Sequence, residues 1–174
     1  MKYIVLLKGV KMKYIILLRG VNISGKNKVS MPKLKQLLEE NNYQNVSTYL
    51  NSGNIIIEFN FNIKTPIYIM TVPELEDILN NSPSWWGTTN KEIYDNLIFI
   101  IPPTTYEEVH NTIDSPKENI DQIEEYYSTI FWSFVLKDYR KSTWWIKTAN
   151  TSITNKITIR TASTMKKLLQ LSQK

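Results

Sequence analysis

The chain contains no cysteine and a single histidine, and only five of its 174 residues are glycine. Without cysteine there is neither a disulfide framework nor thiolate chemistry, and one histidine is too few for the common zinc sites, which cluster Cys and His ligands. We therefore expect no bound metal and no cofactor. The composition, with 42% hydrophobic and 21% charged residues, is otherwise that of a globular protein and excludes an extended disordered chain.

Long hydrophobic runs are also missing. The longest uncharged apolar stretches, Ile15–Leu18 and Leu97–Ile101, are far shorter than the roughly 20 residues that a membrane-spanning helix needs. Lys8, Lys11 and Lys13 interrupt the apolar N-terminal stretch before it reaches the about 7 to 15 apolar residues of a signal-peptide core. We therefore expect no membrane segment and a cytoplasmic location.

Acidic residues are scarce at both ends of the chain. Residues 1–38 carry nine Lys and Arg and no acid, and residues 137–174 carry nine with Asp138 as the single acid. Residues 39–136 carry fifteen acids and three lysines, so the net charges of the first, middle and last stretches are +9, −12 and +8. If the two ends meet in space, they form a positive face suited to nucleic acid, phosphate or another anion. The alternative is that the opposite blocks pair with each other or face solvent.

The first eleven residues repeat in the next eleven. Met1–Lys11 and Met12–Asn22 are identical at eight of eleven positions, and this unit is shorter than solenoid repeats, which run from roughly 20 residues upward. Two near-identical strands compete for one place in a sheet. Because the second copy leads directly into the rest of the chain, we expect it to fill that place. The first copy, residues 1–11, should then pair at a sheet edge, exchange with a neighbouring chain or stay mobile.

From Met12 onward, apolar β-rich stretches alternate with segments of helical spacing. Residues 12–90 and 91–174 each predict the order β-α-β-β-α-β, except that the first half lacks its second crossover helix. About six residues separate Phe59 from Pro66, whereas a helical crossover needs a dozen or more. We therefore predict an α+β fold of two ferredoxin-like halves, in which Asn60–Lys64 is a short connection between antiparallel neighbours. Strands are expected at 14–18, 47–50, 55–59, 67–70, 97–101, 120–127, 130–136 and 157–160, and helices that begin near Ser30, Pro73, Tyr106, Thr143 and Ser163.

Several blocks of sequence, in a fixed order, resemble a bacterial family. They are Leu17–Lys28, Met31-Pro32, Thr48–Ile55, Pro83–Gly87 and Ile157–Leu168, which read LLRGVNISGKNK, MP, TYLNSGNI, PSWWG and ITIRTASTMKKL. These blocks are similar to those of the family called domain of unknown function 1697, from Met12 to about Leu171. The resemblance implies a small cytoplasmic bacterial protein built from two ferredoxin-like halves, and it implies no particular reaction or ligand. The family lacks the segment Met1–Lys11, and it carries a helical segment where Asn60–Asn62 stand here.

The loop after the first of these strands has the spacing of a phosphate-binding loop. Gly20 to Lys26 fits the pattern G-x-x-x-x-G-K, in which backbone amides and a lysine surround phosphates. Asn27 stands where such a loop has the Ser or Thr that binds magnesium, and Pro32 delays the next helix, so we expect the helix N-terminus to lie away from the loop. These departures argue against a nucleotide triphosphatase. They leave either a looser anion-binding loop or an ordinary solvated connection.

Three further groups of polar residues stand at the ends of predicted elements. Residues 51–54 suit a tight turn. The strand-to-helix junction at residues 158–164 can aim Arg160 and helix amides at an anion, or form an N-cap beside a solvent-facing arginine. Residues 140–145 mix cations with aromatics that can stack bases, although one of their two adjacent tryptophans should belong to the core. The candidate ligand-binding residues are Arg19, Asn22, Lys26, Lys28, Asn51, Ser52, Asn54, Arg160 and Thr161, with Lys141, Trp144 and Trp145 at the rim.

No arrangement of residues specifies a reaction, and no catalytic residue is assigned. His110 lies beside two glutamates on a predicted helix, as structural histidines often do, and Ser163–Lys166 matches S-x-x-K without its companion motifs. The sequence favours a module that binds RNA, single-stranded DNA or a small anionic ligand. The alternative is an enzyme acting on a phosphorylated or carboxylated small molecule, with its cations as substrate clamps. A homodimer or other protein contact through Trp85 and Trp86, or a homodimer through the N-terminal strand, is a third hypothesis.

Overall fold

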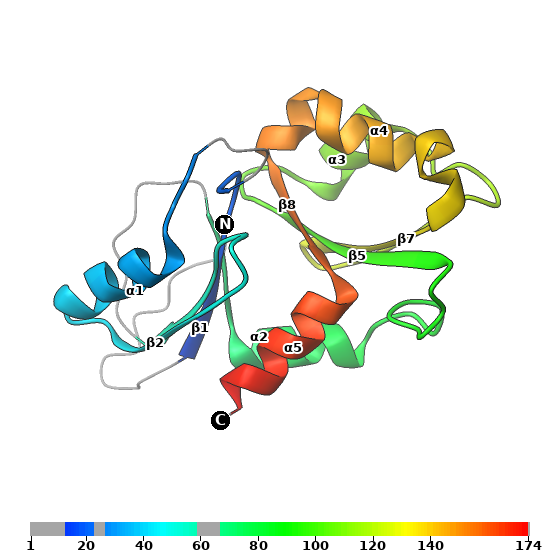
Figure 1. The fold of residues 1–174 in the computed structure, drawn as a ribbon. Coiled ribbons are helices and arrows are strands. Elements are labelled where there is room, and N and C mark those ends of the chain that lie inside the picture. The colour runs from blue at the N-terminus through cyan, green and yellow to red at the C-terminus, as the bar shows by residue number, and fades with distance from the viewer. Residues whose placement is uncertain (1–12, 23–26, 59–66, 174) are drawn as a thin grey trace. The chain divides into compact units, whose positions relative to one another are not determined.

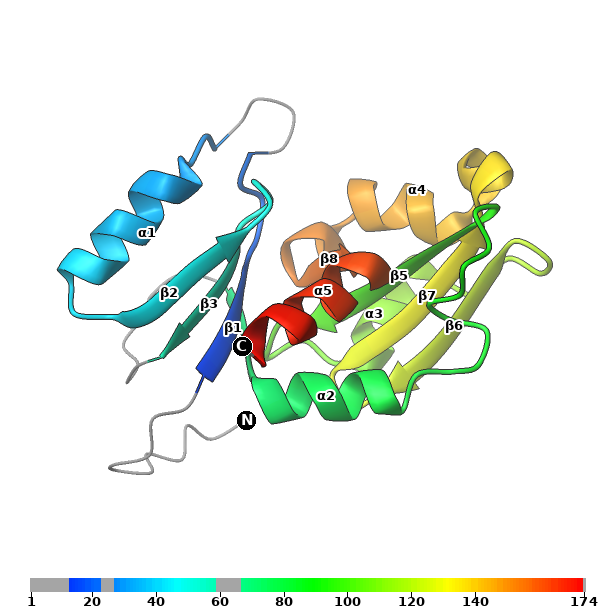
Figure 2. The same ribbon diagram turned by 60° about the horizontal axis from the view of Figure 1, so that its bottom comes forward.

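The computed structural model describes residues 13–22, 27–58 and 67–173. Contacts divide the chain into two compact units: the first unit is Met1–Glu76 with Leu168–Lys174, and the second unit is Asp77–Lys167. Each unit holds one four-stranded antiparallel sheet (Figures 1 and 2). No helix within the described ranges is long and apolar enough to cross a membrane. The elements are β1 (Lys13–Leu18), α1 (Met31–Glu40), β2 (Gln44–Tyr49), β3 (Asn54–Glu58), β4 (Ile67–Thr71), α2 (Val72–Asn80), β5 (Ile93–Ile100), α3 (Tyr106–Ile113), β6 (Asp121–Tyr126), β7 (Thr129–Val135), η1 (Leu136–Lys141), α4 (Thr143–Asn150), η2 (Ser152–Asn155), β8 (Ile157–Thr161) and α5 (Ala162–Ser172).

Strand β1 is central in the first sheet, whose order is β2-β3-β1-β4 with every neighbouring pair antiparallel. Its residues Ile15, Ile16 and Leu17 are each at most 4% exposed, as expected for an apolar strand that is buried on both faces. Helix α1 lies along one face of this sheet (Figure 2). The buried cluster on that face consists of Ile16, Met31, Val46, Ile55 and Ile57.

The connection between β3 and β4 does not join neighbouring strands. Both strands pair antiparallel with β1, one on each side, so they run in the same direction with β1 between them. The prediction that Asn60–Lys64 joins antiparallel neighbours is therefore wrong, while residues 59–66 themselves lie outside the described ranges. The prediction assumed that a short connection implies adjacent strands. The buried backbone of β1 instead decides the order, because it needs a hydrogen-bonded neighbour on each side.

The second sheet repeats the topology of the first, with strand order β6-β7-β5-β8. In both sheets the first strand of the half is central and the third and fourth strands flank it, which is the ferredoxin-like arrangement. The crossover from β7 to β8 contains η1, α4 and η2, and α3 and α4 cover one face of the sheet (Figure 1). The predicted α+β fold of two such halves is thus confirmed. The buried cluster on the covered face includes Ile98, Val109, Ile113, Trp132 and Trp144.

Side-chain caps explain where two of the helices begin. Ser30 caps α1, as predicted, and its hydroxyl accepts a hydrogen bond from the amide of the third helical residue at 3.4 Å. For α5 the prediction placed the cap at Ser163, but the helix begins at Ala162. The hydroxyl of Thr161 accepts from Thr164 N at 3.3 Å instead. The cap lies two residues earlier than predicted because β8 runs directly into α5 with no loop between them.

A buried carboxylate holds the crossover of the second unit in place. Asp121, at the start of β6, is 6% exposed. Its Oδ1 accepts from Trp132 Nε1 at 3.1 Å and from Ser142 Oγ at 2.5 Å, and its Oδ2 accepts from Lys117 N at 3.3 Å and Thr143 N at 3.2 Å. The Ser142 hydroxyl also accepts from the amide of the third residue of α4 and so caps that helix. Charge-assisted hydrogen bonds from one side chain therefore join β6, β7 and the start of α4.

We predict that Asp121→Ala lowers the free energy of unfolding by about 3 kcal/mol, because it leaves the buried donors of Trp132 and Ser142 without their acceptor. Asp121→Asn should cost about 1–2 kcal/mol, since its carbonyl still serves those two donors while its NH2 group faces two backbone N–H groups. Urea unfolding followed by circular dichroism measures both changes. Glu124→Ala, at an exposed position of the same strand, is the control. An Asp121→Ala protein as stable as this control would contradict the role of the carboxylate.

The repeat yields a second prediction. Both edges of β1 are occupied, since Tyr14 pairs with Ile57 on one side and with Thr71 on the other, and the first copy, residues 1–11, lies outside the described ranges. Because the central position is filled, deletion of Met1–Lys11 should leave a single cooperative thermal transition, with a melting temperature within a few degrees of that of the full chain. Differential scanning calorimetry checks this. Loss of the cooperative transition would show that the first copy is part of the core.

Candidate anion-binding site

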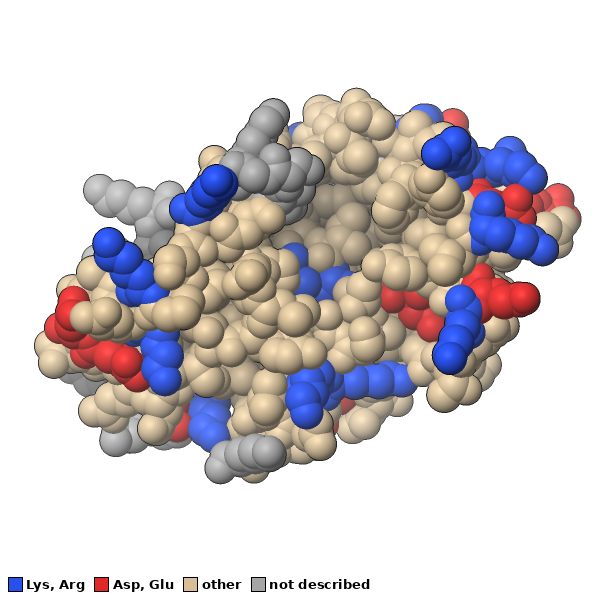
Figure 3. Space-filling view, viewed as in Figure 1, with Lys and Arg blue, Asp and Glu red and all other residues tan. Residues whose placement is uncertain are grey.

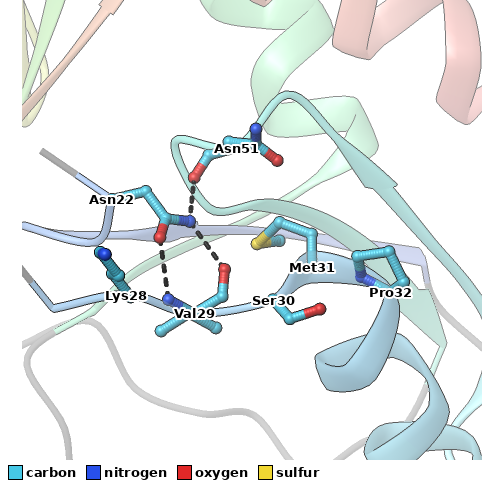
Figure 4. A pocket seen from close by; sticks show the side chains of 7 residues that line it. All are labelled: Asn22, Lys28, Val29, Ser30, Met31, Pro32 and Asn51. Carbon is cyan, nitrogen blue, oxygen red and sulfur yellow. Dashed lines mark hydrogen bonds between the residues drawn. The ribbon is translucent and has the colours of Figure 1, made fainter. Parts of the chain in front are cut away.

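One side chain joins three segments of the first unit. Asn22 follows β1, and its Nδ2 donates to Val29 O at 2.8 Å and to Asn51 O at 2.7 Å, while its Oδ1 accepts from Val29 N at 2.8 Å (Figure 4). Its backbone adopts a φ of 56°, a left-handed conformation that Asn tolerates better than most residues. Asn22 therefore ties the end of β1 to the residues that enter α1 and to the β2–β3 turn.

The three hydrogen bonds of the Asn22 side chain, which we call the Asn22 clamp, also distinguish the two copies of the repeat. At the position of Asn22 in the second copy, the first copy has Lys11. A lysine has three donors and no acceptor, so it cannot accept from Val29 N, and it does not share the tolerance of Asn for a positive φ. The chemistry of this single position favours the second copy in the central strand.

The β2–β3 turn packs closely against the end of β1. Gly53 has a φ of 81°, and a Cβ at this residue would lie 2.6 Å from Val21 Cγ2 and 2.7 Å from Leu18 Cβ, so only glycine fits. Asn54 is fully buried, and its Nδ2 donates to Tyr49 O at 2.7 Å and to Ser52 Oγ at 3.0 Å. The side chains of Ser52 and Asn54 thus stabilise the turn, as the turn interpretation of this segment predicts.

These segments border a pocket of about 520 Å³, within the roughly 300–1,000 Å³ of small-molecule sites. Among the described residues that line it there is one cation, Lys28, and no acid. Helix α1 begins at the pocket and has no acid in its first turn. The start of a helix carries a partial positive charge, so the pocket is suited to an anion, although Pro32 has no N–H and the Lys33 N–H already donates to Ser30 Oγ. Its lining residues are Asn22, Lys28, Val29, Ser30, Met31, Pro32 and Asn51 (Figure 4).

The start of α1 lies near Asn22, while residues 23–26 of the predicted loop lie outside the described ranges, so the expected separation of the helix from the phosphate site stays a prediction. The sequence argument was that Pro32 delays the helix and keeps its N-terminus away from the loop. The structure shows Pro32 and Met31 lining the same pocket as Asn22. The reason is that Asn22 binds both backbone groups of Val29 and draws the residues before α1 back to the end of β1.

The pocket contains three of the nine predicted ligand-binding residues. Asn22, Lys28 and Asn51 line it, whereas Ser52 and Asn54 belong to the adjoining turn. Arg19 is half-buried directly after β1, and Lys26 lies outside the described ranges. Arg160 and Thr161 belong to the second unit. The convergence of the two basic ends therefore stays a prediction.

Arg160 lies on β8 and is largely buried. Its guanidinium Nη1 donates to Thr158 Oγ1 at 3.0 Å and to Ile159 O at 2.8 Å. Burial lowers the pKa of Arg160 to about 10, because desolvation disfavours the charged form. The side chain is still a cation at neutral pH. Its neighbour Thr161 caps α5.

The two predicted rim tryptophans have different environments. Trp144 is fully buried in the core under α4, and its Nε1 donates to Asp114 O at 3.2 Å, so its placement at the rim is corrected. Trp145 is 41% exposed. Lys141, which is exposed, pairs with Asp138 at 2.7 Å. Adjacent residues on a helix point in different directions, and the sequence could not tell which tryptophan would face the sheet.

Three other sequence hypotheses involve side chains that the fold uses structurally. Trp86 is 4% exposed, its Nε1 donates to Asn96 O at 2.6 Å, and its ring meets Phe131 edge-on at 5.0 Å, so Trp86 is a core residue while Trp85 is half-buried. The Lys166 Nζ of the S-x-x-K match donates to Gly87 O at 2.5 Å. The ring of His110 is half-buried and packs against Tyr106. Within the described ranges, no group of three His, Cys, Asp or Glu residues could hold a metal ion.

The sequence predicts no role for Asp121 and no structural role for Asn22. An acid at the start of a strand is usually read as exposed, and only its proximity to Ser142 and Trp132 in the fold shows otherwise. The signal that could have identified Asn22 is the repeat itself. The two copies differ at only three positions, and Asn22 against Lys11 is the one difference that exchanges a neutral side chain for a charge.

We predict that Asn22→Asp destabilises the first unit by about 2 kcal/mol at neutral pH, because a carboxylate oxygen then faces the carbonyl oxygens of Val29 and Asn51 in place of a donor. Asn22→Gly keeps the backbone conformation and loses only the hydrogen bonds, so it should cost less. Chemical denaturation of both variants measures the difference. Asn119→Asp, at an exposed asparagine in a turn that also has a φ of 60°, is the matched control for the added charge. An Asn22→Asp protein as stable as this control would refute the clamp.

Comparisons with known proteins agree with the sequence motifs and the topology. The sequence model of the family described as Protein of unknown function (DUF1697) matches residues 12–60. A structure of a conserved bacterial protein from Streptococcus pneumoniae is 25% identical and has a TM-score of 0.79, covering 94% of this chain and 99% of that chain. No curated protein matches the chain. The resemblance inferred from the motifs is thereby confirmed over residues 12–60, where the chain is similar to the family of unknown function DUF1697.

Proposed function

We propose that the first unit is an anion-binding module and that its ligand site is the pocket at the start of α1. The observation that carries the proposal is the lining of that pocket: Lys28 stands beside the N-terminal turn of α1, and no acid is among its described lining residues. The ligand is a phosphate or carboxylate group, carried by a small molecule or by a nucleic-acid strand.

The clamp at Asn22 supports this proposal because it makes the site rigid before a ligand binds. The amide of Asn22 is occupied by Val29 and Asn51, so it positions the pocket walls and leaves ligand binding to Lys28 and the positive end of α1. A site whose donors are fixed in advance loses little conformational entropy on binding. The two parts of the proposal, a structural amide and a binding cation, can be tested separately.

The charge of the surrounding segment also favours an anion. Lys28 belongs to the N-terminal stretch of 38 residues that has nine cations and no acid, and Lys33 and Lys35 continue this charge along α1. Exposed cations within about 10 Å of a site attract anions at low salt, and added salt screens that attraction. Binding should therefore weaken as the salt concentration rises.

The proposal predicts that pyrophosphate shifts the backbone amide resonances of residues 29–31, 33 and 34 in 1H–15N spectra at low salt. Lys28→Ala should weaken this binding about fivefold, corresponding to about 1 kcal/mol for one partly exposed charge-assisted contact. Lys35→Ala is the matched control. Like Lys28→Ala, it removes one positive charge, but Lys35 lies on α1, pairs with Glu39 at 3.7 Å and does not line the pocket. It should change the affinity less than twofold.

Two results would overturn this assignment. If sodium chloride at the same ionic strength shifts the same amide resonances equally, the effect is charge screening and not pyrophosphate binding. Equal weakening by Lys28→Ala and Lys35→Ala would show a diffuse attraction to the whole helix with no site at the pocket. Thermal unfolding of each variant confirms that it is folded, since exposed lysines contribute little to stability.

A further inference from the structure

Four aromatic rings form a continuous strip in the second unit. The rings of Tyr94 and Phe134 lie 5.3 Å apart between centroids, those of Phe134 and Trp145 5.4 Å apart, and those of Trp145 and Tyr139 5.5 Å apart with an edge-on angle of 85°. The strip crosses from β5 over β7 to α4 and η1. These distances are those of favourable aromatic pairs, so the rings hold one another in place.

The strip presents part of its ring surface to solvent. Trp145 is 41% exposed and Tyr94 is 37% exposed, while Phe134 beneath them is 1% exposed. The backbone of Trp145 is fixed as well, because its amide donates to Ser142 Oγ, which Asp121 holds in turn. A large aromatic side chain that is both exposed and rigid loses little entropy when a ligand stacks on it.

Several cations lie close to the strip in the sequence. Residues 136–147 contain Lys137, Arg140, Lys141 and Lys147, and the single acid Asp138. The Arg140 guanidinium lies 5.5 Å from the centre of the Tyr139 ring, and its Nε donates to the Tyr139 hydroxyl at 2.9 Å. Figure 3 shows Lys and Arg side chains gathered, with Asp and Glu among them, over the end of the second unit where β7 leads into η1.

Two of these lysines already have acidic partners. Lys141 pairs with Asp138, and its hydrogen bond is the main cause that lowers the pKa of Asp138. Lys147 pairs with Asp114 at 3.7 Å. Such exposed pairs contribute little energy, so a phosphate can replace the carboxylate at small cost.

We propose that this aromatic strip and its cations form a stacking surface for single-stranded RNA or DNA. A base would stack on Trp145, the most exposed ring of the strip, and the phosphates beside it would contact Arg140 and the neighbouring lysines. Aromatic platforms beside cations bind single strands in this way, with little sequence preference, because every base has a flat face. A protein partner fits less well, because lysine is depleted at protein interfaces and three of the four cations here are lysines.

The surface belongs entirely to the second unit and does not depend on the pocket of the first unit. Stacking requires free base faces, which a duplex hides. Single strands of about twelve nucleotides should therefore bind more tightly than a duplex of the same length, and affinity should fall as salt rises. Stacking on Trp145 should also quench its fluorescence.

The test is fluorescence anisotropy of labelled dT12 and rU12 at about 50 mM salt with the full chain. Trp145→Ala should weaken binding about tenfold, and Trp145→Phe should restore most of it, since phenylalanine keeps a stacking face. Arg140→Gln should weaken binding and flatten the salt dependence. Tyr127→Ala removes a ring that is 73% exposed outside the strip and is the matched control, with no change expected. Lys28→Ala should likewise leave quenching of Trp145 unchanged.

Three outcomes would overturn the proposal. They are the absence of binding by the wild-type chain at micromolar concentration, equal affinities of Trp145→Ala and Tyr127→Ala, and equal affinity for the single strand and the duplex. Calorimetric melting of Trp145→Ala guards against a folding defect. If Trp145→Ala has a clearly lower melting temperature than the wild-type chain, Trp145→Lys is measured in its place. The lysine variant removes the ring and adds a charge that favours phosphate. Tight binding by Trp145→Lys would then count against stacking.

Discussion

The burial of each central strand is the constraint on which the rest of the fold depends. Ile15–Leu17 in β1 and Leu97–Ile100 in β5 are at most 4% exposed, so their backbone groups can be satisfied only by a neighbouring strand on each side. Antiparallel partners on both sides then run in the same direction as each other. The chain must cross the sheet between them, and the ferredoxin-like order follows from this requirement.

Each unit fixes the segment beside its sheet with one polar side chain. In the first unit the Asn22 amide draws the residues before α1 to the end of β1, and in the second unit the Asp121 carboxylate holds Ser142 and the start of α4. Both side chains satisfy backbone groups at a point where regular hydrogen bonding stops. The pocket lies next to Asn22, and the aromatic strip lies next to the Ser142 cap that Asp121 holds. Hydrogen bonds that stabilise the fold therefore also keep the two candidate binding surfaces rigid.

The sequence predicted what local chemistry decides and missed what distant contacts decide. Apolar runs predicted the central strands, and Ser30 predicted the start of α1, because both features depend on residues that are close together in the sequence. The sequence could not show which of Trp144 and Trp145 enters the core, since that depends on how α4 is rotated, nor that Asp121 would be buried beneath it. Three of the nine candidate ligand residues line one pocket, whereas Arg160 and Thr161 belong to the second unit, a division that a linear pattern does not reveal.

The segregation of charge has an explanation inside each unit. The basic N-terminal stretch supplies Lys28 to the pocket at the start of α1, and the basic C-terminal stretch supplies Arg140 and its neighbouring lysines to the aromatic strip. Neither arrangement requires the two ends to meet. The acidic middle contributes Asp121 and Asp114, of which the first is buried as a structural acceptor and the second pairs with Lys147. A chain of duplicated topology can in this way carry the two proposed cationic surfaces of different chemistry, one a pocket at the start of a helix and the other a strip of packed aromatic rings.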